Sequence, residues 1–151
     1  MKSYKAIAAA LIFAAVPALG QPATDRQSIS GGYFCRAESY RTMDLSRANQ
    51  NYTLCLRSEN DGIVESALAH VAYMRLVLPG ADLRDVRKIV ESLVNSDRLP
   101  VVRYKAYLAS MVFVSPHLFK QAPDVPYATG DEFFAAVDDK LRSSLLGCRA
   151  D

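Results

Sequence analysis

Apolar residues between positions 44 and 114 recur every three or four residues, and the whole pattern repeats after 38 positions. The first copy predicts helices over residues 44–57 and 61–78, and the second copy predicts helices over 82–94 and 100–114. The positions that superpose under this shift include the pairs Ala48 and Val86, Cys55 and Leu93, Ile63 and Val101, Val64 and Val102, Leu68 and Ala106, and Val71 and Ala109. A fixed period of this length is typical of stacked helix pairs, because one pair alone cannot bury its apolar face.

Turn-forming and capping residues mark where these helices begin and end. Residues 58–62 form a turn that supplies N-cap oxygens, and Asp82 is predicted to cap the third helix. Residues 129–132 match a capping box that opens a last helix, which ends at Gly147. No segment of any length shows the two-residue period of a strand. The sequence therefore predicts an all-α fold over residues 44–151, with two stacked helical hairpins and a C-terminal helix that closes one end.

Two other segments are predicted to be irregular. Residues 21–43 form a lead-in that contains Tyr33-Phe34-Cys35, a small apolar cluster that we expect to cap the first hairpin. Residues 115–128 form the longest internal loop, and its three prolines disfavour a helix there.

The first twenty residues have the layout of a secretory signal peptide. A short basic start at residues 1–5 precedes an apolar run over 6–16, which at about eleven residues is too short to span a bilayer. Pro17 breaks this run, and small residues stand at −3 and −1 of a cleavage point before Gln21. A buried N-terminal helix and a retained membrane anchor are the alternatives. We expect a signal peptide over residues 1–20 and an exported bacterial protein, either periplasmic or extracellular.

Removal of the signal peptide leaves a chain without net charge. Loss of Lys2 and Lys5 reduces the 18 basic residues to 16, which balance the 16 acidic ones. A neutral chain with no basic block lacks the charge pattern that binds nucleic acid or anionic lipid. We therefore expect no nucleic-acid partner and no stable membrane insertion after cleavage.

Three cysteines remain in the mature chain, at Cys35, Cys55 and Cys148. An exported protein can form disulfides, and an odd number of cysteines leaves one thiol over or joins two chains. Our hypothesis is a Cys35–Cys55 bond that pins the N-terminal cap to the first hairpin, with Cys148 free or used between chains. The alternative is three reduced thiols, with Cys55 as a small core residue.

Residues 102–109 read Val-Arg-Tyr-Lys-Ala-Tyr-Leu-Ala and resemble the V-R-x-x-A-x-x-A core of the second helix in a HEAT-type repeat. The equivalent residues 64–71 keep the apolar positions but carry Glu65 in place of the arginine. Residues 60–68 and 103–108 also look like a group of small exported bacterial proteins of unassigned function. The resemblance implies a short α-solenoid of two HEAT-like hairpins, a fold whose members commonly bind other proteins.

Two sets of residues are candidates for a binding surface. Two tyrosines and two cations share one helix, at Arg103, Tyr104, Lys105 and Tyr107, and such residues dominate interface energetics. In the alternative interpretation, Arg103 pairs with a neighbouring acid and one tyrosine fills the groove between repeats. The second candidate is the proline-rich loop with Phe119 and Tyr127, since loops held by prolines often carry recognition. Its alternative is a strap that closes the end of the stack.

No catalytic or metal-binding motif is present in the sequence. The G-x-S-x-G and H-E-x-x-H patterns and the phosphate-binding glycine loop are all missing. His70 and His117 lack partners at ligand spacing, so we expect no metal and no cofactor. The sequence favours a non-catalytic protein-interaction module of the bacterial cell envelope or secreted fraction, with an unidentified protein as partner. The alternative is a small exported hydrolase or an enzyme inhibitor.

Overall fold

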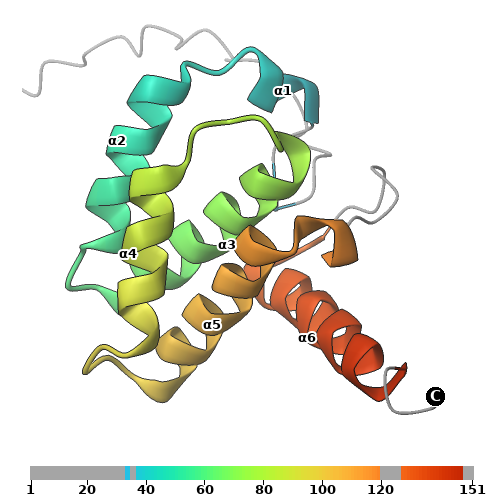
Figure 1. Cartoon of the computed structure of the whole chain (residues 1–151). Helices are drawn as coiled ribbons and strands as arrows, with labels where there is room; N and C mark the ends of the chain where they lie inside the picture. Colours follow the sequence, from blue (N-terminus) through green and yellow to red (C-terminus); the bar gives the residue numbers. More distant parts are fainter. Residues whose placement is uncertain (1–32, 35–36, 120–126, 148–151) are drawn as a thin grey trace, which may run out of the picture.

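The computed structural model describes residues 33–34, 37–119 and 127–147. Regular structure in these ranges is entirely helical, which confirms the all-α prediction. The helices are α1 (Ala37–Arg41), α2 (Leu45–Leu56), α3 (Asp61–Val77), α4 (Arg84–Val94), α5 (Pro100–Val114), the 3₁₀ helix η1 (Pro116–Phe119) and α6 (Gly130–Gly147) (Figure 1). The predicted signal peptide at 1–20 and two of the cysteines, Cys35 and Cys148, lie outside the described residues.

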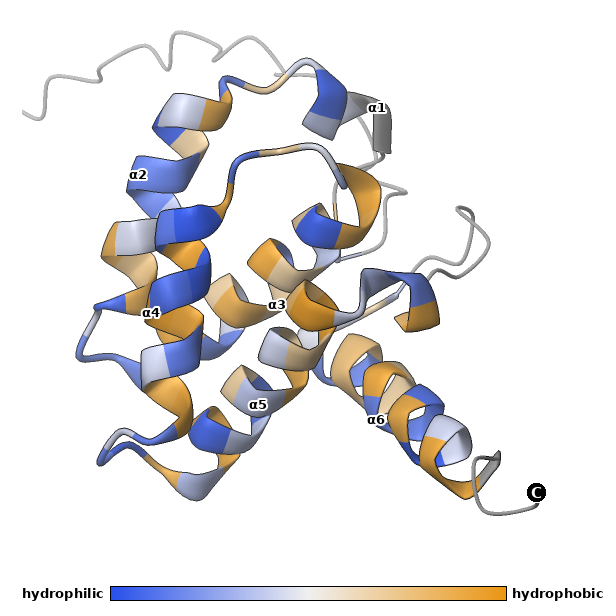
Figure 2. Ribbon diagram, viewed as in Figure 1, coloured by the Kyte–Doolittle hydropathy of each residue, from blue (hydrophilic) through white to orange (hydrophobic). Residues whose placement is uncertain are grey.

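The four central helices form two neighbouring hairpins. The chain reverses direction between α2 and α3 and again between α4 and α5 (Figure 1). Helix α2 packs against α3 and α4, while α5 packs against α4 and α3. The first helices of the two hairpins therefore lie beside each other, and so do the second helices. Figure 2 shows that hydrophilic residues predominate on the outward side of α2 and α4, whereas α3 and α5 are largely hydrophobic.

Burial follows the 38-residue repeat along α3 and α5. Both members of three pairs are fully buried, namely Val64 and Val102, Leu68 and Ala106, and Val71 and Ala109. Ile63 and Val101 also correspond, but both are exposed, by 44% and 45%. These two apolar side chains lie in the exposed first turns of α3 and α5 and do not belong to the buried face of either helix. The two copies nevertheless share a common pattern of burial.

Three of the helix starts are capped by a side-chain oxygen, and the sequence predicts two of these caps, at Asn60 and Thr129. The Asp44 carboxylate accepts a hydrogen bond from the backbone N–H of Arg47 at 3.1 Å. Asn60 Oδ1 accepts from the first turn of α3, and Thr129 Oγ1 accepts from the N–H of Glu132 at 3.1 Å. These bonds satisfy N–H groups that have no partner within the helix.

The start of α4 differs from the prediction, because Leu83 and not Asp82 is its N-cap residue. Leu83 is almost completely buried, so the core fixes the chain there and the helix begins one residue later than a cap at Asp82 would place it. The Asp82 carboxylate nevertheless accepts a hydrogen bond from the backbone N–H of Arg84 at 3.3 Å, and it also binds the guanidinium of Arg84, with an Nη2–Oδ2 distance of 2.7 Å. The hydrogen bonds from Arg84 lower the pKa of Asp82 to about 2.

Two short helices lie in segments that were predicted to be irregular. Helix α1 occupies part of the lead-in, where the buried ring of Tyr40 holds it against the core. The 3₁₀ helix η1 begins at Pro116, where the missing N–H leaves no bond unsatisfied, and buries Phe119. Prolines disfavour a helix interior but tolerate its first turn, so the prediction of a non-helical loop is wrong over these four residues.

Helix α6 packs across α3 and α5, whereas the sequence predicted a helix that closes one end of the stack. Gly130 permits this approach, because a Cβ atom there would lie 3.2 Å from the Cβ of Ala69 on α3. An aromatic cluster fills the junction between α3, α6 and the N-terminal segment. Its rings belong to Tyr33, Phe34, His70, Tyr73, Tyr127 and Phe133, and Phe34 stacks on Tyr73 at 4.3 Å between ring centroids. Tyr33 and Phe34 therefore lie against α3, the second helix of the first hairpin, where α6 also reaches it.

Candidate functional site

One side of α5 is buried and the opposite side is exposed although it is apolar. The buried side faces α3, α4 and α6, and its members include Val102, Ala106, Leu108, Ala109, Val112 and Phe113. The opposite side carries Val101, Tyr104, Tyr107, Met111 and Val114, and we call these five residues the α5 stripe. Their spacings of three and four residues place them along one line of the helix. Four of the five are exposed and Met111 is half-buried.

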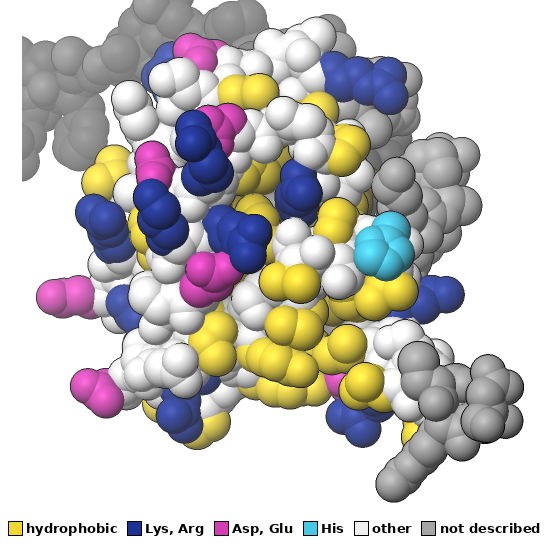
Figure 3. All heavy atoms as spheres, in the orientation of Figure 1, with side chains coloured by type: hydrophobic (Ala, Val, Ile, Leu, Met, Phe, Trp, Pro, Cys, Tyr) yellow, Lys and Arg dark blue, Asp and Glu magenta, His cyan; other side chains and the backbone are white. Residues whose placement is uncertain are grey.

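The exposed face of the neighbouring helix α4 is charged, in contrast to the exposed side of α5. Its exposed residues are mostly charged and paired, as in Arg87–Glu91 and Lys88–Asp85. On the exposed side of α5, Arg103 is the one charged residue. Figure 3 shows hydrophobic side chains gathered over α5, below the basic and acidic side chains of α4. Isolated exposed apolar residues are normal, but a contiguous group of them marks an interaction surface in most soluble proteins.

Tyr104 is held in place by a chain of hydrogen bonds to α6. Its hydroxyl donates to Asp138 Oδ1 at 2.7 Å, and Arg142 Nε donates to Asp138 Oδ2 at 2.9 Å. The hydrogen bond from Tyr104 lowers the pKa of Asp138, and the same bond raises the pKa of Tyr104. The Tyr104 ring also stacks on Tyr107, with 6.4 Å between centroids. Two exposed rings are therefore ordered before any partner arrives, which reduces the entropic cost of binding.

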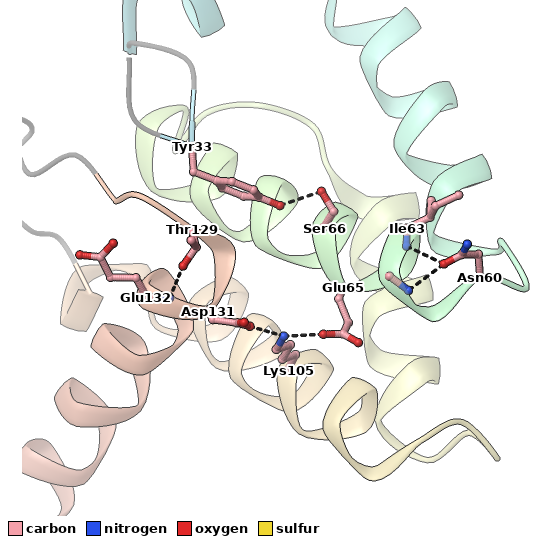
Figure 4. Close-up of polar contacts among 10 residues, drawn as sticks. Tyr33, Asn60, Ile63, Glu65, Ser66, Lys105, Thr129, Asp131 and Glu132 are labelled. Carbon is pink, nitrogen blue, oxygen red and sulfur yellow. Dashed lines mark hydrogen bonds and ion pairs between the residues drawn. The ribbon is translucent and has the colours of Figure 1, made fainter. Parts of the chain in front are cut away.

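Lys105 has a structural role, unlike the two tyrosines. Its ammonium group lies between the carboxylates of Glu65 on α3 and Asp131 on α6, and only 13% of its side chain is exposed (Figure 4). Burial would lower the pKa of Lys105, but the hydrogen bonds with Asp131 and Glu65 outweigh this effect, so its pKa is raised. Lys105 is consequently not available to a partner. It makes the ion pair with a neighbouring acid that the sequence assigned to Arg103.

Arg103 lies beside the α5 stripe and is exposed. Within the described part of the chain, no acidic side chain forms an ion pair with it. Of the four residues predicted on this helix, the structure thus places Arg103, Tyr104 and Tyr107 together on the surface and Lys105 beneath it.

Phe119 and Tyr127 are not surface residues. Their side chains are only 3% and 8% exposed, and both belong to the hydrophobic core. Tyr127 lies edge-on to Phe34 and Phe133, and its carbonyl accepts a hydrogen bond from the N–H of Tyr33. The prediction that these two side chains bind a partner is therefore wrong, because both are buried in the core. They fasten the ends of the 115–128 segment to the core, as the alternative of a closing strap describes.

Cys55 is half-buried on α2 and packs against the core. Since Cys35 lies outside the described residues, the Cys35–Cys55 bond stays a prediction.

Sequence reasoning missed Val101, Met111 and Val114 as surface residues, together with Leu118 of η1, which is also exposed. The composition of α5 could have indicated that part of its exposed side is apolar. Residues 100–114 contain only two charged side chains, Arg103 and Lys105, which are too few to cover an exposed face.

A second concave surface lies between α2 and α4. This groove has a volume of about 1100 Å³, and its lining includes Leu45, Asn49, Leu54, Arg57, Asp85, Lys88 and Ile89. Within this lining, Asn49 Nδ2 donates a hydrogen bond to the carbonyl of Asp82 at 2.8 Å and ties α2 to the segment just before α4. Charged residues along its walls are partly paired with one another, so the groove is a polar surface with scattered apolar contacts.

No family model matches the chain, and comparisons with curated proteins and with solved structures gave no match. Among the described residues, no group of three histidine, cysteine or acidic side chains is placed to hold a metal ion. None of the described helices combines the length and the apolar character needed to cross a membrane.

Proposed function

We propose that this chain is a non-catalytic protein-interaction module, exported to the periplasm or the exterior of a bacterial cell. Its two hairpins act as a short HEAT-like α-solenoid, and the α5 stripe is the contact surface. The observation that carries this proposal is the continuous apolar side of α5 with its two ordered tyrosines. The basic start, the apolar run and the small residues before Gln21 support the proposed export.

The energetics of the α5 stripe support a contact with another protein. Fully burying a large apolar side chain contributes about 1.5–3 kcal/mol. The four exposed members of the stripe are 37–57% exposed, so each can still contribute part of this amount when a partner covers it. Tyrosine and arginine are enriched at the centres of interfaces, and here Tyr104, Tyr107 and Arg103 lie together. The ordered Tyr104 ring adds to this, because less side-chain entropy is lost on binding.

A site-specific photo-crosslink tests the proposal in the full-length chain. Tyr107 is replaced by p-benzoylphenylalanine, which keeps an aromatic ring at that position, and the protein is expressed in a bacterium that exports it. The matched control carries the same residue in place of Lys88, on the solvated side of α4. We expect irradiation to give a covalent protein adduct at position 107 and none at position 88, as read by mass spectrometry. Absence of an adduct at position 107 would overturn the proposal.

A further inference from the structure

A small pocket lies between the last turn of α3, the first turn of α4 and the end of α5, beside the segment that connects α3 to α4 (Figure 1). Its volume is about 130 Å³. Pockets for larger ligands hold about 300–1,000 Å³, so this one has the size for a group of a few heavy atoms. We call it the arginine pocket, and its lining includes Arg75, Asp82, Leu83, Arg84, Arg87 and Phe113.

Positive charge predominates in the arginine pocket. Of the described residues that line it, three carry a guanidinium group and Asp82 carries the single carboxylate, which leaves a net charge of +2. The Asp82 carboxylate is already bound to Arg84. Arg75 is half-buried in the last turn of α3, and no acidic side chain in the described part of the chain forms an ion pair with it. Cations gathered around a small volume repel one another, and a bound anion relieves this repulsion.

The three guanidinium groups are held in place by bonds that leave donors over. Arg75 Nη1 donates to the carbonyl of Pro79, in the segment that follows α3. Arg84 donates to Asp82 through Nε and Nη2, at 2.9 and 2.7 Å. Arg87 Nε donates to the carboxylate one turn further along α4, at 2.7 Å. Each guanidinium has five N–H groups, so every one of the three keeps donors for a ligand. Their prior ordering reduces the entropic cost of binding.

We propose that the arginine pocket binds a single phosphate group through Arg75, Arg84 and Arg87. Two parallel N–H groups of a guanidinium match two oxygens of a phosphate. Three guanidinium groups from two helices suit a tetrahedral group with several acceptor oxygens better than a planar carboxylate, which has two. The pocket is separate from the α5 stripe, because Phe113, its member on α5, belongs to the buried side of that helix. A phosphate site is thus a second binding activity, in addition to the proposed protein contact.

Inorganic phosphate and a phosphate monoester share this chemistry, and calorimetry distinguishes them. Isothermal titration of the protein purified from the exporting cell, at physiological ionic strength and in a phosphate-free buffer, measures the binding of inorganic phosphate and of glycerol 3-phosphate. We expect saturable binding of one ligand per chain. Tighter binding of inorganic phosphate identifies the free ion as the ligand, and tighter binding of glycerol 3-phosphate identifies a monoester. A wild type that binds neither compound overturns the proposal.

Three variants test which residues hold the phosphate. Arg75→Gln and Arg87→Gln should each weaken binding by about tenfold or more, because each removes charge-assisted hydrogen bonds. Arg57 is exposed at the end of α2, and Arg57→Gln removes the same charge there and should leave the affinity unchanged. Circular dichroism shows whether each variant keeps its helices. Equal losses in all three variants overturn the pocket as the site, since they would show a general effect of charge.

Chemical shifts locate the site in the wild type without any substitution. On titration of ¹⁵N-labelled protein with inorganic phosphate, we expect the side-chain Nε–H signals of Arg75, Arg84 and Arg87 to move, together with the backbone N–H signal of Leu83. The Nε–H signal of Arg57 should stay in place. Shifts of equal size at Arg57 and at the three pocket arginines would overturn the proposal, because they would indicate unspecific attraction of the ion to exposed cations.

Discussion

At the scale of single residues, Lys105 connects three helices through one ammonium group. It lies on α5 and pairs with Glu65 of α3 and Asp131 of α6. The pair with Glu65 is largely shielded from water, whereas Asp131 is 78% exposed and is solvated as well as paired. Loss of the cation would therefore leave one partly buried carboxylate without compensation, which is the costly part of breaking such a group.

We expect Lys105→Met to destabilise the protein by about 1–3 kcal/mol, between the values for buried and exposed pairs. Methionine keeps most of the apolar stem, so the change removes mainly the charge. Adding Glu65→Gln to this variant should restore part of the loss, because the uncompensated carboxylate is gone. Lys88→Met, at an exposed pair on α4, is the control and should cost less than about 0.5 kcal/mol. Urea denaturation measures all four values, and equal effects at positions 105 and 88 would contradict the prediction.

His70 illustrates how packing sets the pH response of a single residue. Its ring stacks on Tyr33 at 5.0 Å and lies edge-on to Phe34, and burial lowers its pKa below 6.5. Between that lowered pKa and 6.5, the unfolded chain binds a proton that the folded protein does not. The free energy of unfolding should therefore fall as the pH drops below about 6.5.

The variant His70→Phe keeps a ring in the stack and removes the titrating group. We expect its free energy of unfolding to fall less than that of the wild type between pH 7.5 and pH 5. Identical pH dependence in the wild type and in His70→Phe would show that another group is responsible.

At the scale of elements, α3 and α5 are two versions of one helix. Their core positions correspond residue by residue, yet Leu68 in the first copy matches Ala106 in the second. Both side chains are completely buried. The surroundings of position 68 therefore accommodate a larger side chain than those of position 106. A close-packed interior is destabilised both when a side chain is shortened and when it is enlarged.

We expect Leu68→Ala to cost about 2–5 kcal/mol, because it leaves a cavity in the core. Ala106→Leu should also destabilise, by about 1–3 kcal/mol, because the close approach of α5 to its neighbours leaves no room for a larger side chain. Ile63→Ala is the control on the exposed first turn of α3 and should have a smaller effect. Thermal denaturation measures the three changes. Unchanged melting temperatures for both core variants would refute the equivalence of the two helices.

At the scale of the whole molecule, the position of α6 decides which surface is covered. This helix lies across α3 and α5 and buries Phe133, Phe134 and Val137 against them. The α5 stripe lies outside this contact, except where Tyr104 reaches Asp138. The α5 stripe is therefore left open to the surroundings, and the proposed export determines which partners it meets there.

Expression of the full-length chain in a bacterium tests the export. We expect the protein outside the cytoplasm, shortened by residues 1–20, since the sequence before Gln21 has the layout of a signal peptide. Cell fractionation followed by mass spectrometry of the intact protein gives both the location and the new N-terminus. Exported protein that still begins at Met1 or Lys2 would contradict the predicted cleavage.

The sequence by itself determined the type and the approximate bounds of α2 to α6. It also determined the caps at Asn60 and Thr129 and the common burial pattern of α3 and α5. These features are local, because apolar spacing and capping act within one helix and its first turn. That is why they can be predicted without knowing which helices are neighbours.

Only the tertiary structure decided which apolar residues are covered. Helix α5 is apolar on nearly every side, so its sequence could not indicate that Val101, Tyr104 and Val114 face solvent while Leu108 and Val112 do not. The start of α4 at a buried Leu83, the burial of Phe119 and Tyr127, and the exchange of roles between Arg103 and Lys105 depend in the same way on contacts with distant segments. Periodicity identifies a face of a helix, but only the packing of other elements determines whether that face is buried or left for a partner.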